Sequence, residues 1–331
     1  MLFVSFVVTS SYRIGVDGGG TKTEFILVDA AGTAVARHLA PGCNPSQIGA
    51  ERARSILLEG LGQLLAQAKL AHPNPRIAAT HLYMAGSNAI WREIASGLKD
   101  CGALVVAADS LPVLELATAG RPGLVLHAGT GSFVAARAAD GSVHYAGGLG
   151  WKLGDAGSGY DLGRRTMAHA LLELQALTWS GGDPAAGDAS AAGSPPLQKL
   201  SPLAEALCAH TGFTDYATNS RFLYQDPGAN AAIAGFAPRV LELAERDCGP
   251  AQQVVADSVT ELARLADQVI HRLFPAPASP VPCGVSGRIL NSAPAAFALR
   301  SLAAKLRWPV ALHFITESPA EGVRRLLVQS A

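Results

Sequence analysis

Short apolar runs and longer runs of helical spacing alternate along the chain in a fixed order. Three apolar runs lie so close together that they predict an antiparallel meander of strands; they are residues 13–17, 23–28 and 33–39. Leucine and isoleucine then recur at helical spacing, and strand and helix signals alternate after them. The elements predicted there are a helix over 51–69, a strand over 77–84, a helix near 89–99 and a strand over 103–108.

The same order of elements returns in the second part of the chain. Residues 123–148 read as strand, glycine loop, strand, Ala-Asp-Gly turn and strand. Gly20–Thr21 aligns with Gly129–Thr130, and Gly32 aligns with Gly141, each pair 109 positions apart. Two features with one offset indicate a duplication. The elements predicted after this second meander are helices over 160–177 and 252–273, a strand over 281–285, a helix over 294–302, a strand over 309–314 and a helix from 319.

A meander followed by alternating helices and strands, present twice, predicts an α/β fold. We expect two duplicated domains with mixed five-stranded sheets and a cleft between them. The N-terminal domain should span residues 1–118 and be completed by the helix at 319–331, and the C-terminal domain should span 119–318. The second domain should carry a helical insertion at about 160–250, and the turn-rich residues 180–196 predict a mobile surface loop.

Composition and charge narrow the classes of function. Of 331 residues, 49% are hydrophobic and 16% are charged, with 26 basic against 26 acidic side chains. This balance removes the electrostatic case for a nucleic acid or an anionic membrane as partner. The five cysteines contain no CxxC pair, which argues against a disulfide framework or a metal site and favours the cytoplasm. The apolar residues 1–8 lack a preceding basic residue, and no run reaches the ~20 apolar residues of a membrane span. A homodimer stays an open alternative.

The glycine loop of Gly18, Gly19 and Gly20 is followed by residues of strand character. A dinucleotide-binding fingerprint or a Walker P-loop requires a helix at this place, so both are disfavoured. A glycine turn between two strands can still bind phosphate, because positive φ angles direct consecutive N–H groups into one concavity. Thr21 adds a hydroxyl group, and Lys22 adds a countercharge.

Asp17 precedes this loop, and its carboxylate is placed to hold Mg²⁺ through water. An equivalent loop in the second half, with Gly129, Thr130 and Gly131, offers a second phosphate site from the opposite domain. The alternative is that each loop is only a hairpin turn. That alternative loses weight because the two loops occupy equivalent positions of a duplicated chain.

Five motifs follow one another along the chain: GVDGGGTKTEFILVD, GCNPSQIG, AADS, HAGTGS and GGLGWKLGDAGSGYDLGRR. Together they resemble the N-acetylglucosamine kinase branch of the actin/Hsp70/sugar-kinase superfamily, which is grouped with the BadF/BadG/BcrA/BcrD ATPases. The resemblance covers nearly the whole chain. It implies two RNase H-like domains that hold ATP, Mg²⁺ and an amino sugar between them, and transfer of the γ-phosphate to the sugar 6-hydroxyl.

The resemblance also implies roles for single residues. Asp109 follows an apolar strand and corresponds to the catalytic base that accepts the proton of the 6-hydroxyl; the alternative is that it caps the next helix. Asp155 and Asn44 correspond to ligands of the sugar hydroxyls, with an N-cap and an Asx-turn as their alternatives. Ser286 and Gly287 end a strand and are expected beside the adenosine.

The remaining residues expected near the sugar are Ser132, Gly148, Leu149 and Gly150. Trp151 is either a sugar-stacking face or a core residue. The residues expected only to occupy a helix face are Asp161, Arg164 and Arg165.

Three positions depart from the usual family pattern, namely Ala156, Phe133 and Leu149. All three are expected on the sugar side, so glucosamine is an alternative acceptor to N-acetylglucosamine. A dehydratase-type activating ATPase is a further alternative, although the cysteines do not group as an iron–sulfur cluster requires. A sugar sensor without catalytic activity is the alternative outside the enzymes.

Overall fold

The computed structural model describes residues 11–71, 75–180 and 199–329 of the chain. The apolar residues 1–8 and nearly all of the predicted loop at 180–196 lie outside the described residues. None of the described helices combines the length and the hydropathy that a membrane crossing requires.

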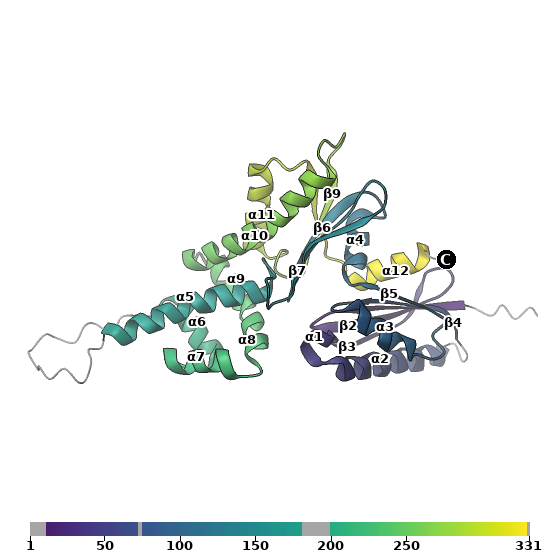
Figure 1. Ribbon diagram of the computed structural model, residues 1–331, viewed down its shortest axis with the longest axis horizontal. Coiled ribbons are helices and arrows are strands. Elements are labelled where there is room, and N and C mark those ends of the chain that lie inside the picture. The colour runs from purple at the N-terminus through teal and green to yellow at the C-terminus, as the bar shows by residue number, and fades with distance from the viewer. Residues whose placement is uncertain (1–10, 72–74, 181–198, 330–331) are drawn as a thin grey trace, which may run out of the picture.

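The first sheet is formed by five strands: β1 (Ser11–Gly18), β2 (Lys22–Val28), β3 (Ala34–Pro41), β4 (Arg76–Met84) and β5 (Ala103–Ala108). Their order across the sheet is β3-β2-β1-β4-β5 (Figure 1). β1, β2 and β3 form the predicted antiparallel meander, while β4 pairs in parallel with β1 and β5 in parallel with β4.

The second sheet repeats this topology with five strands: β6 (Gly123–Ala128), β7 (Ser132–Arg137), β8 (Val143–Gly147), β9 (Val281–Ser286) and β10 (Val310–Phe314). Their order is β10-β9-β6-β7-β8. The turns between second and third strands also repeat, because Gly32 and Gly141 donate equivalent hydrogen bonds of 3.0 Å and have φ angles of 80° and 84°. The prediction of a duplicated α/β fold with two mixed sheets is therefore confirmed.

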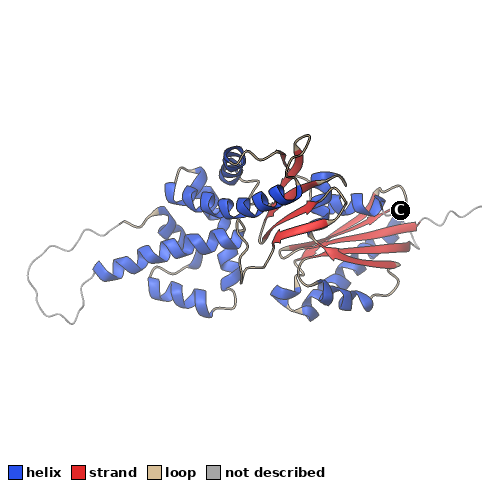
Figure 2. Cartoon of the chain, turned by 45° about the horizontal axis from the view of Figure 1, so that its top comes forward, coloured by secondary structure: helices blue, strands red, loops and turns tan. Residues whose placement is uncertain are grey.

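Helices cover the outer face of each sheet. The first sheet carries α1 (Pro45–Ile48), α2 (Ala50–Ala71) and α3 (Asn88–Ser96). On the second sheet lie α10 (Gly249–Leu273) and α11 (Ala293–Lys305). The predicted insertion consists of α5 (Gly159–Ser180), α6 (Pro202–Thr211), α7 (Tyr216–Gln225), α8 (Ala229–Gly235) and α9 (Ala237–Glu245), and Figure 2 shows it extending away from both sheets.

Two helices lie between the sheets, α4 (Ser110–Thr118) and α12 (Pro319–Gln329) (Figure 1). α4 follows β5 of the first sheet but packs on β6, β7 and β9 of the second, whereas α12 follows β10 of the second sheet but packs on β1 and β2 of the first. The two halves thus exchange the helix that follows their fifth strand. The predicted limits of the domains stay a prediction, since the packing of α4 crosses the limit at residue 118.

Glycine permits the close approach of these two helices. A Cβ atom on Gly15 of β1 would lie 2.2 Å from Cγ1 of Val323 in α12. A Cβ atom on Gly284 of β9 would lie 2.5 Å from the Cβ atom of Ala117 in α4. Where the helices meet each other, a Cβ atom on Gly322 would lie 2.1 Å from the carbonyl oxygen of Pro112. Side chains at these positions would push the two halves apart.

Candidate active site

The first glycine loop is a tight hairpin between β1 and β2, closed by a 3.0 Å hydrogen bond from the Gly19 amide to the Lys22 carbonyl. Gly18, Gly19 and Gly20 do not have φ angles in the left-handed region, so the prediction that positive φ angles build an anion nest here is wrong. Gly18 is closely packed instead. A Cβ atom on Gly18 would lie 2.4 Å from Cε of Met84 in the core.

The second glycine loop closes with a 2.9 Å hydrogen bond from the Gly129 amide to the Gly131 carbonyl. Both of its glycines also lack left-handed φ angles. The tips of the two loops meet, because Oγ1 of Thr21 and Oγ1 of Thr130 are 2.7 Å apart. Within the described chain, the backbone amides of Gly20, Thr21, Thr130 and Gly131 donate no hydrogen bond. Four unpaired N–H groups at adjoining loop tips are available to an anion.

Two carboxyl groups lie at the ends of β1 and β5 and affect each other electrostatically. Asp17, near the end of β1, is 8% exposed, and burial together with the negative charges of Asp109 and Glu24 raises its pKa to about 8. Asp109 stands between β5 and α4, and burial raises its pKa to about 6 although the nearby backbone amides oppose the rise. The Asp109 side chain makes no capping hydrogen bond, and Oγ of Ser110 has no partner among the described residues, so neither side chain caps α4.

Lys22 is bound to a neighbour that the sequence analysis missed. Its Nζ lies 2.8 Å from Oε1 of Glu24, and the other carboxylate oxygen of Glu24 accepts a hydrogen bond from Ser318, just before α12. Burial alone would raise the pKa of Glu24, but the hydrogen bonds from Lys22 and Ser318 hold it below its usual value. The alternation of side chains along β2 could have placed Glu24 on the same face as Lys22, but not beside Ser318.

Asp155 lies beside the second glycine loop. A Cβ atom on Gly131 would lie 3.1 Å from its Oδ2, and its Oδ1 accepts a 3.2 Å hydrogen bond from the Gly150 amide. Burial raises the pKa of Asp155 to about 6, against the hydrogen bonds from the amides of Gly150 and Ser132. The hydroxyl of Ser132 donates a 2.7 Å hydrogen bond to the Ala156 carbonyl, which fixes this loop against β7.

The neighbouring segment turns on three glycines with φ angles between 67° and 82°, namely Gly147, Gly148 and Gly150. It leaves Leu149 65% exposed. Trp151 is half-buried, and its ring centroid lies 5.6 Å from that of Tyr160, so it is neither a fully buried core residue nor a free stacking surface. The backbone of this segment can approach a ligand closely.

Asp161 is not merely part of a helix face, as the sequence analysis expected. It is 4% exposed, and its Oδ2 accepts a 2.6 Å hydrogen bond from Ser258 of α10. Arg164 and Arg165 bind its Oδ1 at 2.9 and 2.8 Å, and the Gly157 amide donates to its Oδ2 at 3.3 Å. Asp161 therefore anchors the end of the loop that carries Asp155. The partner Ser258 lies 97 positions away, which is why local spacing could not reveal it.

Asn44 forms the Asx-turn that was its alternative, because its Oδ1 accepts a 3.0 Å hydrogen bond from the Ser46 amide. The same oxygen lies 2.7 Å from the position of a Cβ atom on Gly86. No hydrogen bond or ion pair between described residues links Asn44 or Asp109 to Asp155. The structure thus brings Asp17 and Asp109 together in one half and Asp155 and Ser132 in the other, and joins the halves at the two threonines.

Ser286 and Gly287 have structural partners at the end of β9. Oγ of Ser286 lies 3.3 Å from Nδ1 of His127, and a Cβ atom on Gly287 would lie 2.2 Å from the carbonyl oxygen of Ala128. His127 stacks on Phe133 with 4.9 Å between ring centroids, and burial lowers the pKa of His127 to about 4. Their contact with adenosine stays a prediction.

The carboxyl groups also define what metal the site could hold. The described residues contain no cluster of three or more His, Cys, Asp or Glu side chains suited to a metal ion. Mg²⁺ fits the donors that are present, because it is commonly held by one or two carboxylates together with waters and substrate phosphates. Asp17, near the end of β1 and close to Asp109, is such a carboxylate.

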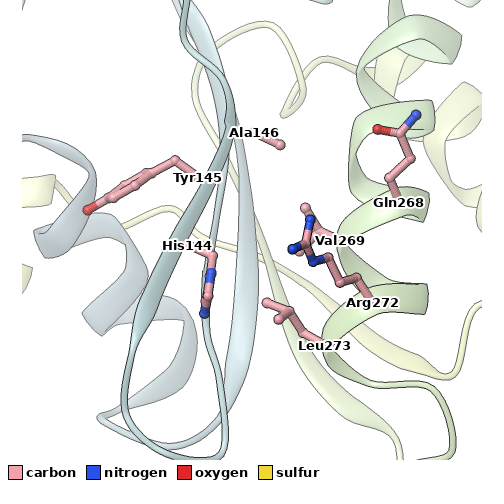
Figure 3. Close-up of a pocket in the computed structure, with 7 residues that line it drawn as sticks. All are labelled: His144, Tyr145, Ala146, Gln268, Val269, Arg272 and Leu273. Carbon is pink, nitrogen blue, oxygen red and sulfur yellow. The ribbon is translucent and has the colours of Figure 1, made fainter.

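Two cavities of the described structure lie elsewhere. One, of about 230 Å³, is lined by His144 and Ala146 of β8 and by Val269 and Arg272 of α10, while Tyr145 points away from α10 (Figure 3). The other, of about 270 Å³, lies between α11 and β10. Neither is lined by a predicted site residue.

A family model matches residues 14–305, and its family is the BadF/BadG/BcrA/BcrD ATPases. The chain belongs to this ATPase family. The match confirms the resemblance seen in the five motifs. It covers both glycine loops, Asp109 and Asp155, and it ends at the last residue of α11.

Two curated relatives of the chain are named as sugar kinases. An N-acetyl-D-glucosamine kinase of Dictyostelium discoideum is 29% identical over 170 residues, and an N-acetylmuramic acid/N-acetylglucosamine kinase of Clostridium acetobutylicum is 30% identical over 176 residues. Each match covers 48% of this chain, and the chain spans about half, 53%, of the length of each relative.

A solved structure matches over nearly its whole length. It is a Chromobacterium violaceum protein provisionally named an N-acetylglucosamine kinase, with a TM-score of 0.72 and 26% identity. The match covers 96% of this chain and 98% of that one. The chain therefore shares the fold of that protein over nearly its whole described length, including both sheets.

Proposed function

We propose that this protein is an ATP-dependent amino-sugar kinase that transfers the γ-phosphate to the 6-hydroxyl of N-acetylglucosamine. Membership of the ATPase family and the names of the relatives from Dictyostelium discoideum and Clostridium acetobutylicum support this activity and this substrate class. The single observation that carries the proposal is the position of Asp109, which is half-buried, does not cap α4 and lies close enough to Asp17 for its charge to raise the Asp17 pKa.

Asp109 is suited to act as the general base. With a pKa of about 6, the Asp109 carboxyl group is mostly ionised at neutral pH and can accept the proton of an attacking hydroxyl group. A carboxylate with its usual pKa near 4 would be a weaker base. A base of this kind contributes about 10²–10⁴-fold to the rate, and the larger part of phosphoryl-transfer catalysis comes from positioning and charge neutralisation.

The loop tips supply that positioning. The unpaired amides of Gly20, Thr21, Thr130 and Gly131 would bind oxygens of the triphosphate from both halves of the molecule. Mg²⁺ would be held by Asp17 and would neutralise charge on the phosphates. The ammonium group of Lys22 reaches the phosphates only when it leaves Glu24, its partner at 2.8 Å.

The sugar would lie between Asp109 and the segment around Asp155. The carboxylate of Asp155 and the backbone of Gly148–Gly150 would bind its hydroxyls, and Asn44 would do so through the amide nitrogen that its turn leaves available. Because Leu149 is exposed beside this position, it would contact the group on the sugar nitrogen. N-acetylglucosamine is therefore the first acceptor to test, and glucosamine the second.

Release of ADP, coupled to a spectroscopic readout, tests the function on N-acetylglucosamine, glucosamine and glucose. We expect turnover with an amino sugar, little ADP release without sugar, and a loss of about 10²-fold or more in kcat for Asp109→Asn at nearly unchanged sugar affinity. Asp257→Asn on the exposed face of α10 is the matched control and should keep full activity. ADP release that ignores the sugar would indicate an ATPase activator instead. Sugar binding without turnover would indicate a sensor.

A further inference from the structure

One carboxylate of β2 joins the first glycine loop to α12. Oε1 of Glu24 accepts a 2.8 Å hydrogen bond from Nζ of Lys22, and its Oε2 accepts one from the hydroxyl of Ser318. Burial alone would raise the pKa of Glu24, but these two donors and the Ala320 amide hold it below its usual value. Ser318 and Ala320 lie at the start of α12, where the unpaired amides of a helix attract a negative charge. Glu24 therefore caps α12 from a different element while it binds Lys22.

Ser318 also lies where the chain crosses from the second sheet to the first. The amide of Ile315, directly after β10, donates a 2.8 Å hydrogen bond to the Val285 carbonyl of β9, and the Ile315 carbonyl accepts one of 2.8 Å from Asn291. Only two residues separate this anchor in the second half from Ser318. The bond between Glu24 and Ser318 therefore fixes the crossover beside the first glycine loop.

The strand pairing places Lys22 and Glu24 next to the carboxyl group of Asp17. Asp17 and Glu24 are directly opposite each other in the antiparallel pairing of β1 and β2, and the side chains of such a pair lie on one face of the sheet. Lys22, two positions before Glu24, projects from the same face. In agreement, the charge of Lys22 opposes the rise in the Asp17 pKa that burial and the neighbouring carboxylates cause. The ammonium group that Glu24 binds is thus close enough to Asp17 to affect its charge.

The two partners of Glu24 differ in how easily they can leave. The side chain of Lys22 is 50% exposed, and a partly exposed ion pair contributes little to stability, so a phosphate group can replace the carboxylate. Ser318 is fixed by the backbone, because its carbonyl accepts a 2.8 Å hydrogen bond from the Glu321 amide in the first turn of α12. Since both oxygens of Glu24 already accept hydrogen bonds, Glu24 is not a free ligand for Mg²⁺.

We propose that Glu24 is a positioning residue for the nucleotide. Before the nucleotide binds, one oxygen of Glu24 holds the ammonium group of Lys22 beside Asp17, and the incoming phosphates then take this group over. The other oxygen keeps Ser318, and with it the start of α12, in place throughout. This inference rests on the proposed function, since it takes the two loop tips as the phosphate site. It explains why an acidic side chain stands beside a site for polyanionic phosphates.

Isothermal titration calorimetry with Mg²⁺ and a non-hydrolysable ATP analogue tests this role without sugar. Glu24→Gln keeps a carbonyl oxygen for Ser318 but presents an uncharged amide group to Lys22. It should bind the analogue about fivefold more tightly than the wild type, which is the upper range for a partly exposed ion pair. In a Lys22→Met background the same substitution should change the affinity by less than about twofold. Glu242→Gln, which breaks the exposed 2.9 Å ion pair with Arg239, is the matched control and should bind like the wild type.

Ser318→Ala separates the roles of the two oxygens. It should lower the melting temperature, because α12 loses a hydrogen bond at its start, and it should not tighten binding of the analogue. If Glu24→Gln tightens binding through Lys22 and the wild type phosphorylates no sugar, the proposed function fails and the role of Glu24 stands. Unchanged or weaker binding by Glu24→Gln, or an equal gain in the Lys22→Met background, would overturn the role of Glu24. A wild type that binds no analogue would overturn both proposals.

Discussion

Replacement of Asp17 by asparagine should stabilise the ligand-free protein in a way that depends on pH. Asp17 has a pKa of about 8 in the folded chain against 3.8 for an aspartate exposed to water in the unfolded chain, because burial and the charges of Asp109 and Glu24 disfavour its ionised form. The folded state therefore binds a proton that the unfolded state releases. The stability from this neutral carboxyl is fully present below pH 3.8 and is lost as the pH rises through about 8.

The magnitude follows from the two pKa values. A rise from 3.8 to about 8 corresponds to on the order of 6 kcal/mol against the ionised form. Asparagine has nearly the shape of the neutral acid and cannot ionise. The stability of Asp17→Asn relative to the wild type should therefore increase by on the order of 4 kcal/mol between pH 5 and pH 9. For a chain of this size that is a difference of roughly 6 °C in melting temperature.

Differential scanning fluorimetry of both proteins at pH 5, 7 and 9, without nucleotide or Mg²⁺, measures this difference. The matched control is Asp257→Asn on the exposed face of α10, whose melting temperature should follow that of the wild type at every pH. If the melting temperature of Asp17→Asn exceeds that of the wild type by the same amount at pH 5 and pH 9, the reasoning is refuted. It would show that the Asp17 carboxyl is not held neutral by its surroundings.

Two further predictions concern the base and the helix contact. At saturating ATP, kcat/KM for the sugar should rise with pH through about 6, because burial raises the pKa of Asp109 to about 6 and the base must be ionised. The control variant Asp155→Asn should show the same rise. A flat profile of kcat/KM from pH 5 to 8 would count against Asp109 as the base. Gly15→Ala should lower the free energy of unfolding in urea by about 1–3 kcal/mol, since the new Cβ atom would lie 2.2 Å from Cγ1 of the buried Val323. Gly62→Ala in α2 is the control. Its Cβ atom would have no neighbouring atom within 4 Å, so this variant should be neutral or stabilising.

The fold was accessible from the sequence where its signals are local. Strand alternation and the turns at Gly32 and Gly141 depend on residues a few positions apart, so both meanders and their offset could be predicted. Family motifs indicated Asp109 as a site residue. Its proximity to Asp17 could not be predicted, because the two residues are far apart in the sequence and are brought together only by the fold. The exchange of α4 and α12 was equally hidden, because the packing of a helix on a distant sheet leaves no periodic signal.

The wrong interpretations have one physical cause, which is that tertiary contacts decide what a local pattern means. Glycine in a loop suggests positive φ, but Gly18 lacks a left-handed φ angle and packs closely against the side chain of Met84. An aspartate followed by arginines three and four positions later suggests an exposed helix face. At Asp161 the hydroxyl of Ser258 from α10 turns the same pattern into a buried anchor.

The exchanged helices explain why a base carried by the first half can respond to the second. α4 is covalently attached to β5 beside Asp109, but its buried residues Val113, Leu114 and Ala117 pack against Val125 and other residues of the second sheet. A rotation of that sheet must therefore carry the end of α4 with it, because close-packed interiors transmit displacement and do not absorb it. Through α4, the orientation of Asp109 depends on the second sheet, which also presents Thr130 to the phosphates. Binding at the second loop and the position of the base are in this way mechanically linked.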